Sequence, residues 1–441
     1  MRYPILLLVA APLGAQTTTK LAVRPLPAPT ATSTETVRSL AAVRQLANGN
    51  VLVNDQAGRR VVLMDSTLKV IGVVADSTSS TANAYGPRPG GLIAYRGDST
   101  LFVDPASLSM LVIDPAGKIA RVMAAPRPND VMFLTGGPMG SPGFDAKGRL
   151  VYRGFSRPNF GPGGPAAGTP PVLPDSEAIL RFDLASRKLD TAAFFKVYRP
   201  KMNIERDSTG VRMTSYINPL PVVDEWVVLA DGSIAIVRGR DYRVEFVSAD
   251  GAATKGEKLP YDWQRLTDED KAAFIDSTKA AMTRARAAGG APGGANAGFG
   301  MGGGMGGGGQ MVIRMEDRSG PGGPPPGAAG GTREQIVMGG PPAGAQLPPL
   351  TFISPSELPD YKPVFGPGAV RADADGNIWV RTIPTKPTAG VVYEVIDRSG
   401  KLVDRVLVPS TSVIVGFGAG GVVYMGTRDA AGIHVQRAHV K

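Results

Sequence analysis

Arginine residues recur at or near the ends of short apolar runs in this chain. The set comprises Arg153, Arg238, Arg240, Arg381 and Arg428. A guanidinium group is planar and can donate two parallel hydrogen bonds to a carboxylate, phosphate or sulfate. If the ends of these runs meet at one edge of the fold, the arginines form a site for an anionic ligand. The alternative is that they pair with Asp and Glu of neighbouring elements or are solvated, since most surface ion pairs are structural background.

One member of this set is shifted by one residue relative to the others. Arg153 and Arg381 come directly after their apolar triplets, whereas Arg238 comes one residue later than the corresponding place. Successive side chains of a strand point to opposite faces of the sheet. A slip of one residue therefore turns Arg238 to the other face unless a β-bulge corrects it.

A second set of polar residues has the chemistry of a divalent-cation site. Oxygen atoms of Asp and Asn are ligands that calcium accepts. The candidates are Asn54, Asp55, Asp104, Asp145 and Asp373. The same residue types also occupy ordinary turns, where they bond the local backbone. We therefore expect no cofactor, and we keep a calcium or other divalent-cation site as the alternative.

Histidine offers little support for a metal site. His434 and His439 are the two histidines of the chain and lie five residues apart on one expected strand. Strand alternation places them on opposite faces, so we expect structural or solvated roles for both.

The elements that would position these residues are short strands separated by turn signals. In the stretch 371–408, apolar runs are separated by Asp375-Gly376 and by a second turn at 397–400. Asp-Gly between apolar runs favours a two-residue hairpin turn, because such turns need positive φ. The stretch therefore predicts four antiparallel strands.

The same pattern recurs about six times along the chain. Where no insertion intervenes, the turn glycines recur roughly every 44 to 50 residues, which is the range of four-stranded propeller blades. The runs are nearly continuous in Val, Ile, Leu and aromatic residues, as strands buried on both faces should be. The last copy lacks its final strand, and Leu21–Arg24 alternates like an edge strand. We predict an all-β six-bladed β-propeller whose ring this N-terminal strand closes, removing an exposed edge.

Two kinds of residue in the repeat have a structural explanation. Four aspartates end the third strand of a copy and are expected to close its last hairpin by bonding the backbone. They are Asp65, Asp114, Asp183 and Asp397. Trp226 and Trp379 are expected in the core between blades.

The first fifteen residues resemble a signal peptide. Arg2 is followed by a short apolar run and by small residues before Gln16. The run is too short for a membrane span, which needs about 20 residues. The sequence contains no Cys, so there is no site for a lipid anchor and no disulfide. We expect an exported, periplasmic or extracellular protein that is neither a lipoprotein nor membrane-spanning.

The remaining chain divides into four parts. They are an extended N-terminal segment with the closing strand at 16–38, blades one to four at 39–264, an insertion at 265–358, and blades five and six at 359–441. Within the insertion, Thr267 and the acidic residues after it predict a helix over about 267–288. The following 291–345 is rich in Gly and Pro, and we expect it to be disordered apart from the short apolar run 311–314. It is either a lid or tether or a tolerated insertion. A smaller Gly/Pro-rich insertion lies at 159–174.

Composition and charge narrow the partner classes. The chain has 441 residues, of which 43% are hydrophobic, enough for a sizeable core. The formal net charge of +10 suits acidic partners. Lys and Arg are scattered, and no recognition helix accompanies them, so we expect no nucleic-acid binding.

The repeat resembles that of a known group of propellers. The residues at 374–380, with the turn at 397–401, are similar to NHL-type repeats and to exported bacterial propellers of the TolB-like group. Such propellers include binding scaffolds, lactonases, other hydrolases and lyases, so the resemblance implies a fold more than an activity. We expect a monomeric binding or interaction module for a protein, a peptide or an anionic small molecule. The alternative is a metal-assisted hydrolase or lactonase-like enzyme with ligands in the central channel.

Overall fold

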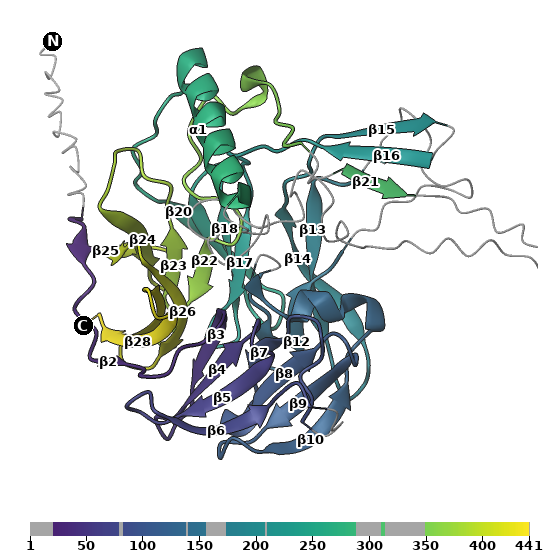
Figure 1. Ribbon diagram of the computed structural model, residues 1–441, viewed down its shortest axis with the longest axis vertical. Helices are drawn as coiled ribbons and strands as arrows, with labels where there is room; N and C mark the ends of the chain where they lie inside the picture. The colour runs from purple at the N-terminus through teal and green to yellow at the C-terminus, as the bar shows by residue number, and fades with distance from the viewer. Residues whose placement is uncertain are drawn as a thin grey trace, which may run out of the picture.

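Six four-stranded antiparallel sheets form the body of the molecule (Figure 1). The computed structural model describes residues 21–78, 83–137, 140–155, 173–207, 210–287, 310–313 and 349–440. Within these residues the first strands of blades six, one, two, three, four and five contact one another in that order, so the first strands form the inner ring around the channel. The prediction of a six-bladed all-β propeller is confirmed.

The first three blades follow one another without exchange of strands. Their strands, from inner to outer, are β3 (Leu40–Gln45), β4 (Val51–Asp55), β5 (Arg60–Met64) and β6 (Val70–Ala75) in blade one; β7 (Gly91–Ala94), β8 (Thr100–Asp104), β9 (Ser109–Ile113) and β10 (Ile119–Ala124) in blade two; and β11 (Gly143–Phe144), β12 (Leu150–Arg153), β13 (Ser176–Phe182) and β14 (Leu189–Lys196) in blade three.

The last two blades receive strands from the N-terminal segment. The strands are β17 (Glu225–Val228), β18 (Ile234–Arg238), β19 (Arg243–Val247) and β20 (Ala253–Lys258) in blade four; β22 (Val370–Ala372), β23 (Ile378–Arg381), β24 (Gly390–Ile396), β25 (Leu402–Pro409) and the added β1 (Arg24–Pro25) in blade five; and β26 (Ser412–Gly418), β27 (Val422–Arg428), β28 (Ile433–His439) and β2 (Ala31–Thr32) in blade six.

The core lies between neighbouring blades rather than in one central mass. Trp226 of blade four is buried against Val151 and Phe195 of blade three. Trp379 of blade five packs in the same way on Phe417 of blade six. Each blade thus buries both faces, which explains why its strands are nearly continuous in apolar residues. The predicted core positions of both tryptophans are confirmed.

The hairpin aspartates also behave as predicted. Asp65 Oδ1 accepts the backbone N–H groups of Thr67 and Lys69 at 2.8 and 3.1 Å. Asp114, Asp183 and Asp397 accept equivalent backbone N–H groups in their own turns. These carboxylates hold the outer hairpin of each blade in shape.

The N-terminal segment closes the ring, but with a different strand from the one we expected. Ala31–Thr32 pairs antiparallel with β28, whereas Leu21–Arg24 does not belong to blade six. Arg24 and Pro25 instead add to blade five, parallel to β25. The closing strand is fixed by contacts that alternation cannot reveal. Ser33 exchanges hydrogen bonds with the Val435 backbone, and its carbonyl oxygen lies 2.8 Å from Nδ1 of His434.

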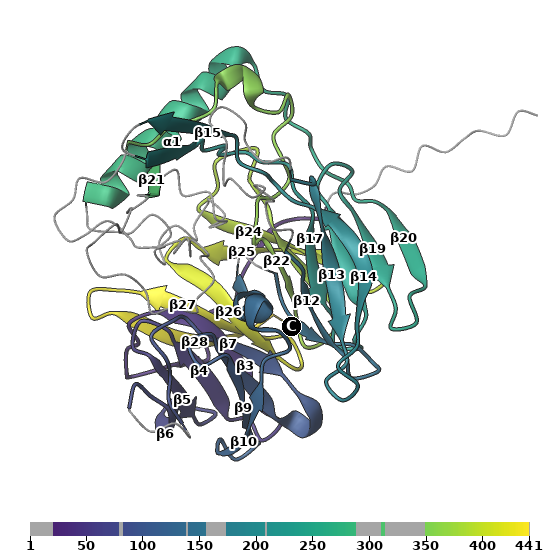
Figure 2. The same ribbon diagram turned by 90° about the vertical axis from the view of Figure 1, so that its right-hand side faces the viewer.

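The connections between blades three and four and between blades four and five stand on one face of the propeller. In a blade, the loop after the second strand and the connection to the next blade emerge on the same face. The connection between blades three and four forms the hairpin β15 (Met202–Asp207) and β16 (Gly210–Ser215), which the sequence did not predict. Strand β21 (Gln310–Ile313), from the insertion between blades four and five, pairs with β16. Two separate insertions thus form one unit with α1 (Asp268–Ala287), here called the cap (Figure 2).

The helix of the cap matches its predicted position. The N–H of Asp270 donates to Thr267 Oγ1 at 3.1 Å, and the N–H of Thr267 donates to Asp270 Oδ2 at 3.0 Å. This reciprocal capping satisfies donors that the first turn would otherwise leave open. Ile275 is buried in a small core with Leu220 and Ile353 of the flanking connections.

A few smaller features complete the described structure. Short 3₁₀ helices are η1 (Arg96–Asp98), η2 (Pro128–Leu134) and η5 (Pro355–Glu357). No helix among the described residues has the length and apolar character needed to cross a membrane. The predicted signal peptide at 1–15, and the stretch at 291–345 apart from β21, lie outside the described residues, as does most of the insertion at 159–174.

Candidate anion site at the channel mouth

Two charged residues stand on neighbouring strands of the inner ring. Glu225 is the first residue of β17, and Arg371 is the middle residue of β22. Both strands begin on the cap side, since the connections between blades emerge there. The two residues therefore lie at the mouth of the channel, between blades four and five.

Glu225 carries a buried carboxyl group that has few hydrogen-bond or ion-pair partners. Its side chain accepts one hydrogen bond, from the backbone N–H of Gly368 to Oε1 at 2.9 Å. Among the described residues no cation lies within ion-pair distance of it. Burial raises the pKa of Glu225 to about 7, although the Gly368 N–H and the charges of Arg153, Arg381 and Arg371 act to lower it. At neutral pH this carboxyl is thus close to its titration midpoint.

Arg371 is a half-buried guanidinium on the innermost strand. Within the described part of the chain, its side chain has neither a hydrogen bond nor an ion pair. Burial lowers the pKa of Arg371, and the nearby positive charge of Arg381 adds to this effect. Tyr393 and Glu225 act in the opposite direction. Tyr393 is itself buried, and burial raises the pKa of its hydroxyl, so it is neutral.

Arg153 lies at the same mouth, and its guanidinium group forms an ion pair within the protein. Its Nε forms an ion pair with Oε2 of Glu177, whose side chain is fully buried. Arg199 reaches the other oxygen of Glu177 at 2.8 Å. The Arg153 guanidinium also lies over the ring of Phe195, 5.4 Å from its centroid. Arg153 is therefore held in place by its neighbours while its charge still acts on Glu225.

Arg238 faces away from this group. Strand β18 pairs with β17 and β19 without a register shift, so no bulge corrects the one-residue slip. The guanidinium instead binds Asp224 at 2.7 Å and Glu245 at 2.6 Å. It also donates to the carbonyl oxygen of Phe194 in blade three. Arg238 thus joins blades three and four, as the alternative interpretation of the arginine set proposed for its members.

The three other arginines of the set occupy two kinds of position. Arg381 is half-buried at the end of β23, and its charge acts on both Glu225 and Arg371. Arg240 and Arg428 are exposed and form no ion pair with described residues. The structure therefore brings Arg153 and Arg381 together with two residues that the sequence did not single out, Arg371 and Glu225.

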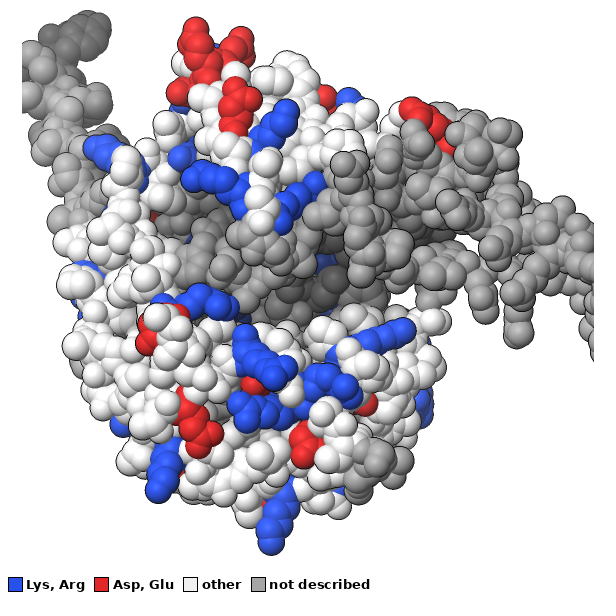
Figure 3. All heavy atoms as spheres, viewed as in Figure 1, with Lys and Arg blue, Asp and Glu red and all other residues white. Residues whose placement is uncertain are grey.

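The channel mouth carries an excess of positive charge. Four arginines, Arg153, Arg199, Arg371 and Arg381, face the two carboxyls of Glu177 and Glu225. The excess is two charges when both carboxyls are ionised and three when Glu225 is protonated. Lys and Arg side chains are also exposed on the cap and on the blades below it in the view of Figure 3. Positive potential of this kind attracts small anions.

The cap-side members of the proposed cation set are bound within the fold. Asn54 Oδ1 accepts the Tyr85 hydroxyl at 2.9 Å, and its Nδ2 donates to the Gly90 carbonyl oxygen. Asp55 Oδ1 accepts several backbone N–H groups, including that of Gly58 at 3.0 Å. Asp104 accepts the N–H groups of the turn that follows it.

The other two members lie on the opposite face. Asp145 accepts backbone N–H groups in the turn between β11 and β12, and Asp373 does the same between β22 and β23. First-to-second-strand turns are on the side away from the cap. Across the described ranges, no three His, Asp or Glu residues are placed to hold a metal ion. The structure does not bring these five residues together.

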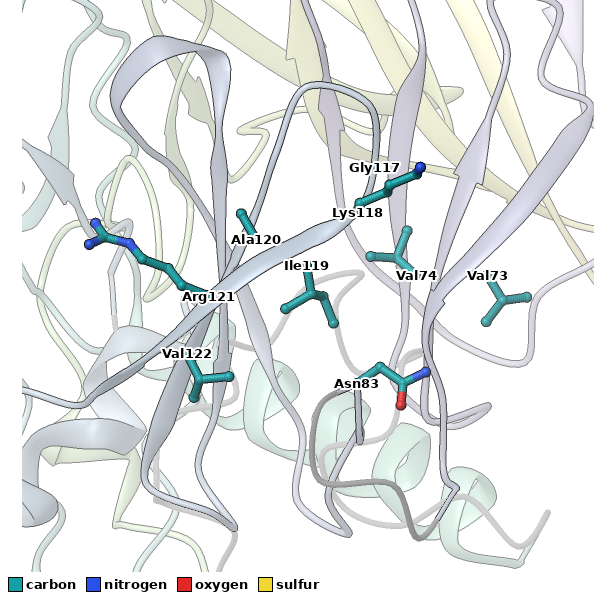
Figure 4. A pocket seen from close by; sticks show the side chains of 9 residues that line it. All are labelled: Val73, Val74, Asn83, Gly117, Lys118, Ile119, Ala120, Arg121 and Val122. Atoms are coloured by element: carbon teal, nitrogen blue, oxygen red, sulfur yellow. The ribbon is translucent and has the colours of Figure 1, made fainter.

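An open groove lies elsewhere, between the outer strands of blades one and two (Figure 4). It has a volume of about 520 Å³ and is lined by Val73 and Val74 of β6 and by the 117–122 stretch that enters β10. Its walls combine apolar side chains with the polar or charged side chains of Asn83, Lys118 and Arg121, and no carboxylate lines it. This groove is remote from the inner strands that carry Glu225 and Arg371.

A sequence signal for the two missed residues exists but is weak. Inner strands are packed between neighbouring blades, so a charged residue inside one is unusual. Arg371 directly follows Ala369 and Val370, and Glu225 directly precedes the apolar run 226–229. Their proximity depends on the angle between two blades, which no local pattern specifies.

The sequence matches no family model and no curated protein. Solved structures with some similarity include virginiamycin B lyase from Staphylococcus aureus, with 9% identity and a TM-score of 0.36 over 92% of this chain and 97% of that chain. A gluconolactonase from Xanthomonas campestris has 12% identity and a TM-score of 0.35 over 94% and 99%. The calcium-binding protein regucalcin from Agrobacterium tumefaciens has 11% identity and a TM-score of 0.38 over 95% and 97%. These values are too low to transfer an activity, so the site must be judged on its own residues.

Proposed function

We propose that this protein is an exported binding module that holds a small anionic ligand at the mouth of its propeller channel. The ligand would carry a carboxylate, phosphate or sulfate group. Arg371 and Arg381 would bind this group, and Arg153 would add its charge from the side. Export rests on the expected signal peptide, and the NHL-type and TolB-like resemblance fits this role.

The observation that supports this function best is the state of Arg371. A half-buried guanidinium loses part of its hydration, and this loss is costly when no acceptor replaces the water. Arg153 and Arg238 have carboxylate partners, whereas Arg371 has none among the described residues. An anion in the channel mouth would supply the missing acceptor through charge-assisted hydrogen bonds.

The position of the cap is consistent with a binding site at this mouth. The cap stands on the face where β17 and β22 begin, so a ligand must pass beside it. Among the described residues, the opposite face carries the short hairpin turns between first and second strands and between third and fourth strands. Loops that stand on a rigid scaffold are where binding surfaces are commonly found.

Calorimetric titration with sulfate, phosphate and malonate tests the proposal. Arg371→Met keeps most of the side-chain volume and removes the charge. We expect affinity for the bound anion to fall by about tenfold to a hundredfold, as for loss of a charge-assisted hydrogen bond. Arg240→Met is the matched control, because Arg240 is exposed in a cap-side loop of blade four. Equal affinity of the Arg371 variant and the wild type, or no binding of any anion, would refute the proposal.

A metal-assisted hydrolase or lactonase has no specific observation in its favour. The oxygen atoms that such a site would need from Asn54, Asp55, Asp104, Asp145 and Asp373 accept hydrogen bonds from neighbouring turns and side chains.

A further inference from the structure

We propose that the channel mouth binds its anion together with one proton, and that Glu225 holds this proton. The inference rests on the proposed function and adds the chemistry of the bound state. The proton comes from solvent and is placed on Oε2 of Glu225. The resulting neutral carboxyl donates an O–H···O hydrogen bond to the anion that Arg371 and Arg381 hold.

The hydrogen bonding of Glu225 leaves one oxygen for this role. The Gly368 N–H donates to Oε1, an acceptor bond that a protonated carboxyl can keep. Oε2 has no hydrogen-bond partner within the described ranges. A proton on Oε2 therefore needs an acceptor, and a bound oxyanion provides one. The same carboxyl in its ionised form would present a negative oxygen to a negative ligand.

Electrostatics couples the two events. Three guanidinium groups, those of Arg153, Arg371 and Arg381, favour the ionised form of Glu225. An anion bound among them offsets part of their charge, so the carboxyl loses this support. Two like charges in one partly desolvated site also disfavour each other. Both effects move Glu225 toward its protonated form when the ligand binds.

The other titratable groups around Glu225 either form ion pairs with arginines or are neutral. The adjacent Asp224 is neutralised by Arg238, and its Oδ1 accepts the N–H of Gly239. Glu177 on β13 is held between Arg153 and Arg199. Tyr393 on β24 is buried and neutral.

The raised pKa of Glu225 in the unliganded protein favours this coupling. Burial raises the pKa of Glu225 to about 7 before any ligand is present. A modest further rise on binding is then enough to keep the carboxyl protonated at neutral pH. A surface glutamate, with its pKa near 4, would need a far larger change.

Sulfate is the probe of choice because its charge does not change between about pH 6 and about pH 8. Titration calorimetry in buffers of different ionisation enthalpy counts the protons taken up with each anion. We expect net uptake of protons with sulfate at about pH 8, where the unliganded carboxyl is mostly ionised. We also expect the affinity to fall by up to about tenfold per pH unit above about pH 7, as linked protonation requires.

Glu225→Gln keeps the Oε1 acceptor and removes the titration. This variant should bind sulfate without proton uptake and with an affinity that does not change over the same pH range. Glu257→Gln, at an exposed position on β20, is the matched control and should behave as the wild type does.

The outcomes separate the two proposals. If sulfate and the other anions fail to bind at any pH, the proposed function is wrong. If the wild type binds sulfate with no proton uptake at about pH 8, the function stands and the coupling is wrong. If Glu225→Gln does not fold, proton uptake by the wild type decides the matter alone.

Discussion

The buried carboxyl of Glu225 should make the stability of this protein depend on pH in a way that one substitution removes. The pKa rises from the ordinary value of 4.5 to about 7 in the fold. The folded state therefore binds the proton more tightly than the unfolded state does. Stability from this group is fully present below about pH 4.5, and it is lost as the pH rises through about 7.

The size of the effect follows from the same two values. They differ by about 2.5 pH units, and each unit corresponds to about 1.4 kcal/mol. Relative to Glu225→Gln, the wild type should lose about 3 kcal/mol of unfolding free energy between about pH 4.5 and about pH 8.5. Glutamine keeps the bond from Gly368 and carries no charge, so the difference between the two proteins isolates this titration.

Urea denaturation of both proteins, followed by tryptophan fluorescence at several pH values, measures the difference. Trp226 is adjacent to Glu225 in β17 and is buried between blades, so it reports on unfolding of this region. Glu257→Gln again serves as the control, since Glu257 is exposed. Parallel curves of stability against pH for wild type and Glu225→Gln would show that Glu225 is not held near neutrality. The electrostatic account of the channel mouth would then fail.

Two further predictions concern the scaffold. Ser33→Pro removes the N–H that donates to Val435 and the hydroxyl that accepts from it, so we expect a loss of at least about 2 kcal/mol. Thr34→Pro, at the exposed neighbouring residue, removes neither of these bonds and should cost less; equal losses would contradict the account of ring closure. Thr267→Ala removes the cap of α1 and should cost about 1 kcal/mol in thermal or urea unfolding. Thr283→Ala, whose hydroxyl bonds Lys279 within the helix, is the control, and a cap variant as stable as this control would contradict the assigned role.

The blades themselves could be read from the sequence because their signals are local. An Asp-Gly turn, a run of β-branched residues and an aspartate at the end of the third strand each act within a few residues of one another. The bonds of Asp65 and Asp114 to their own turns show this directly. The capped start of α1 at Thr267 is local in the same sense. Such features predict a repeat, its period and the number of blades.

Only the tertiary structure decided which strand closes the ring and which arginines form ion pairs with described carboxylates. Ser33 meets Val435 across almost the whole chain, and residues 21–24 have an equally suitable alternation. Arg238 and Arg371 are both arginines on blade strands, yet one binds two carboxylates and the other binds none among the described residues. Partners such as these come from neighbouring strands and blades, and their distance depends on how the sheets pack. The sequence alone therefore determined the scaffold, while packing between neighbouring blades determined which residues form the candidate site.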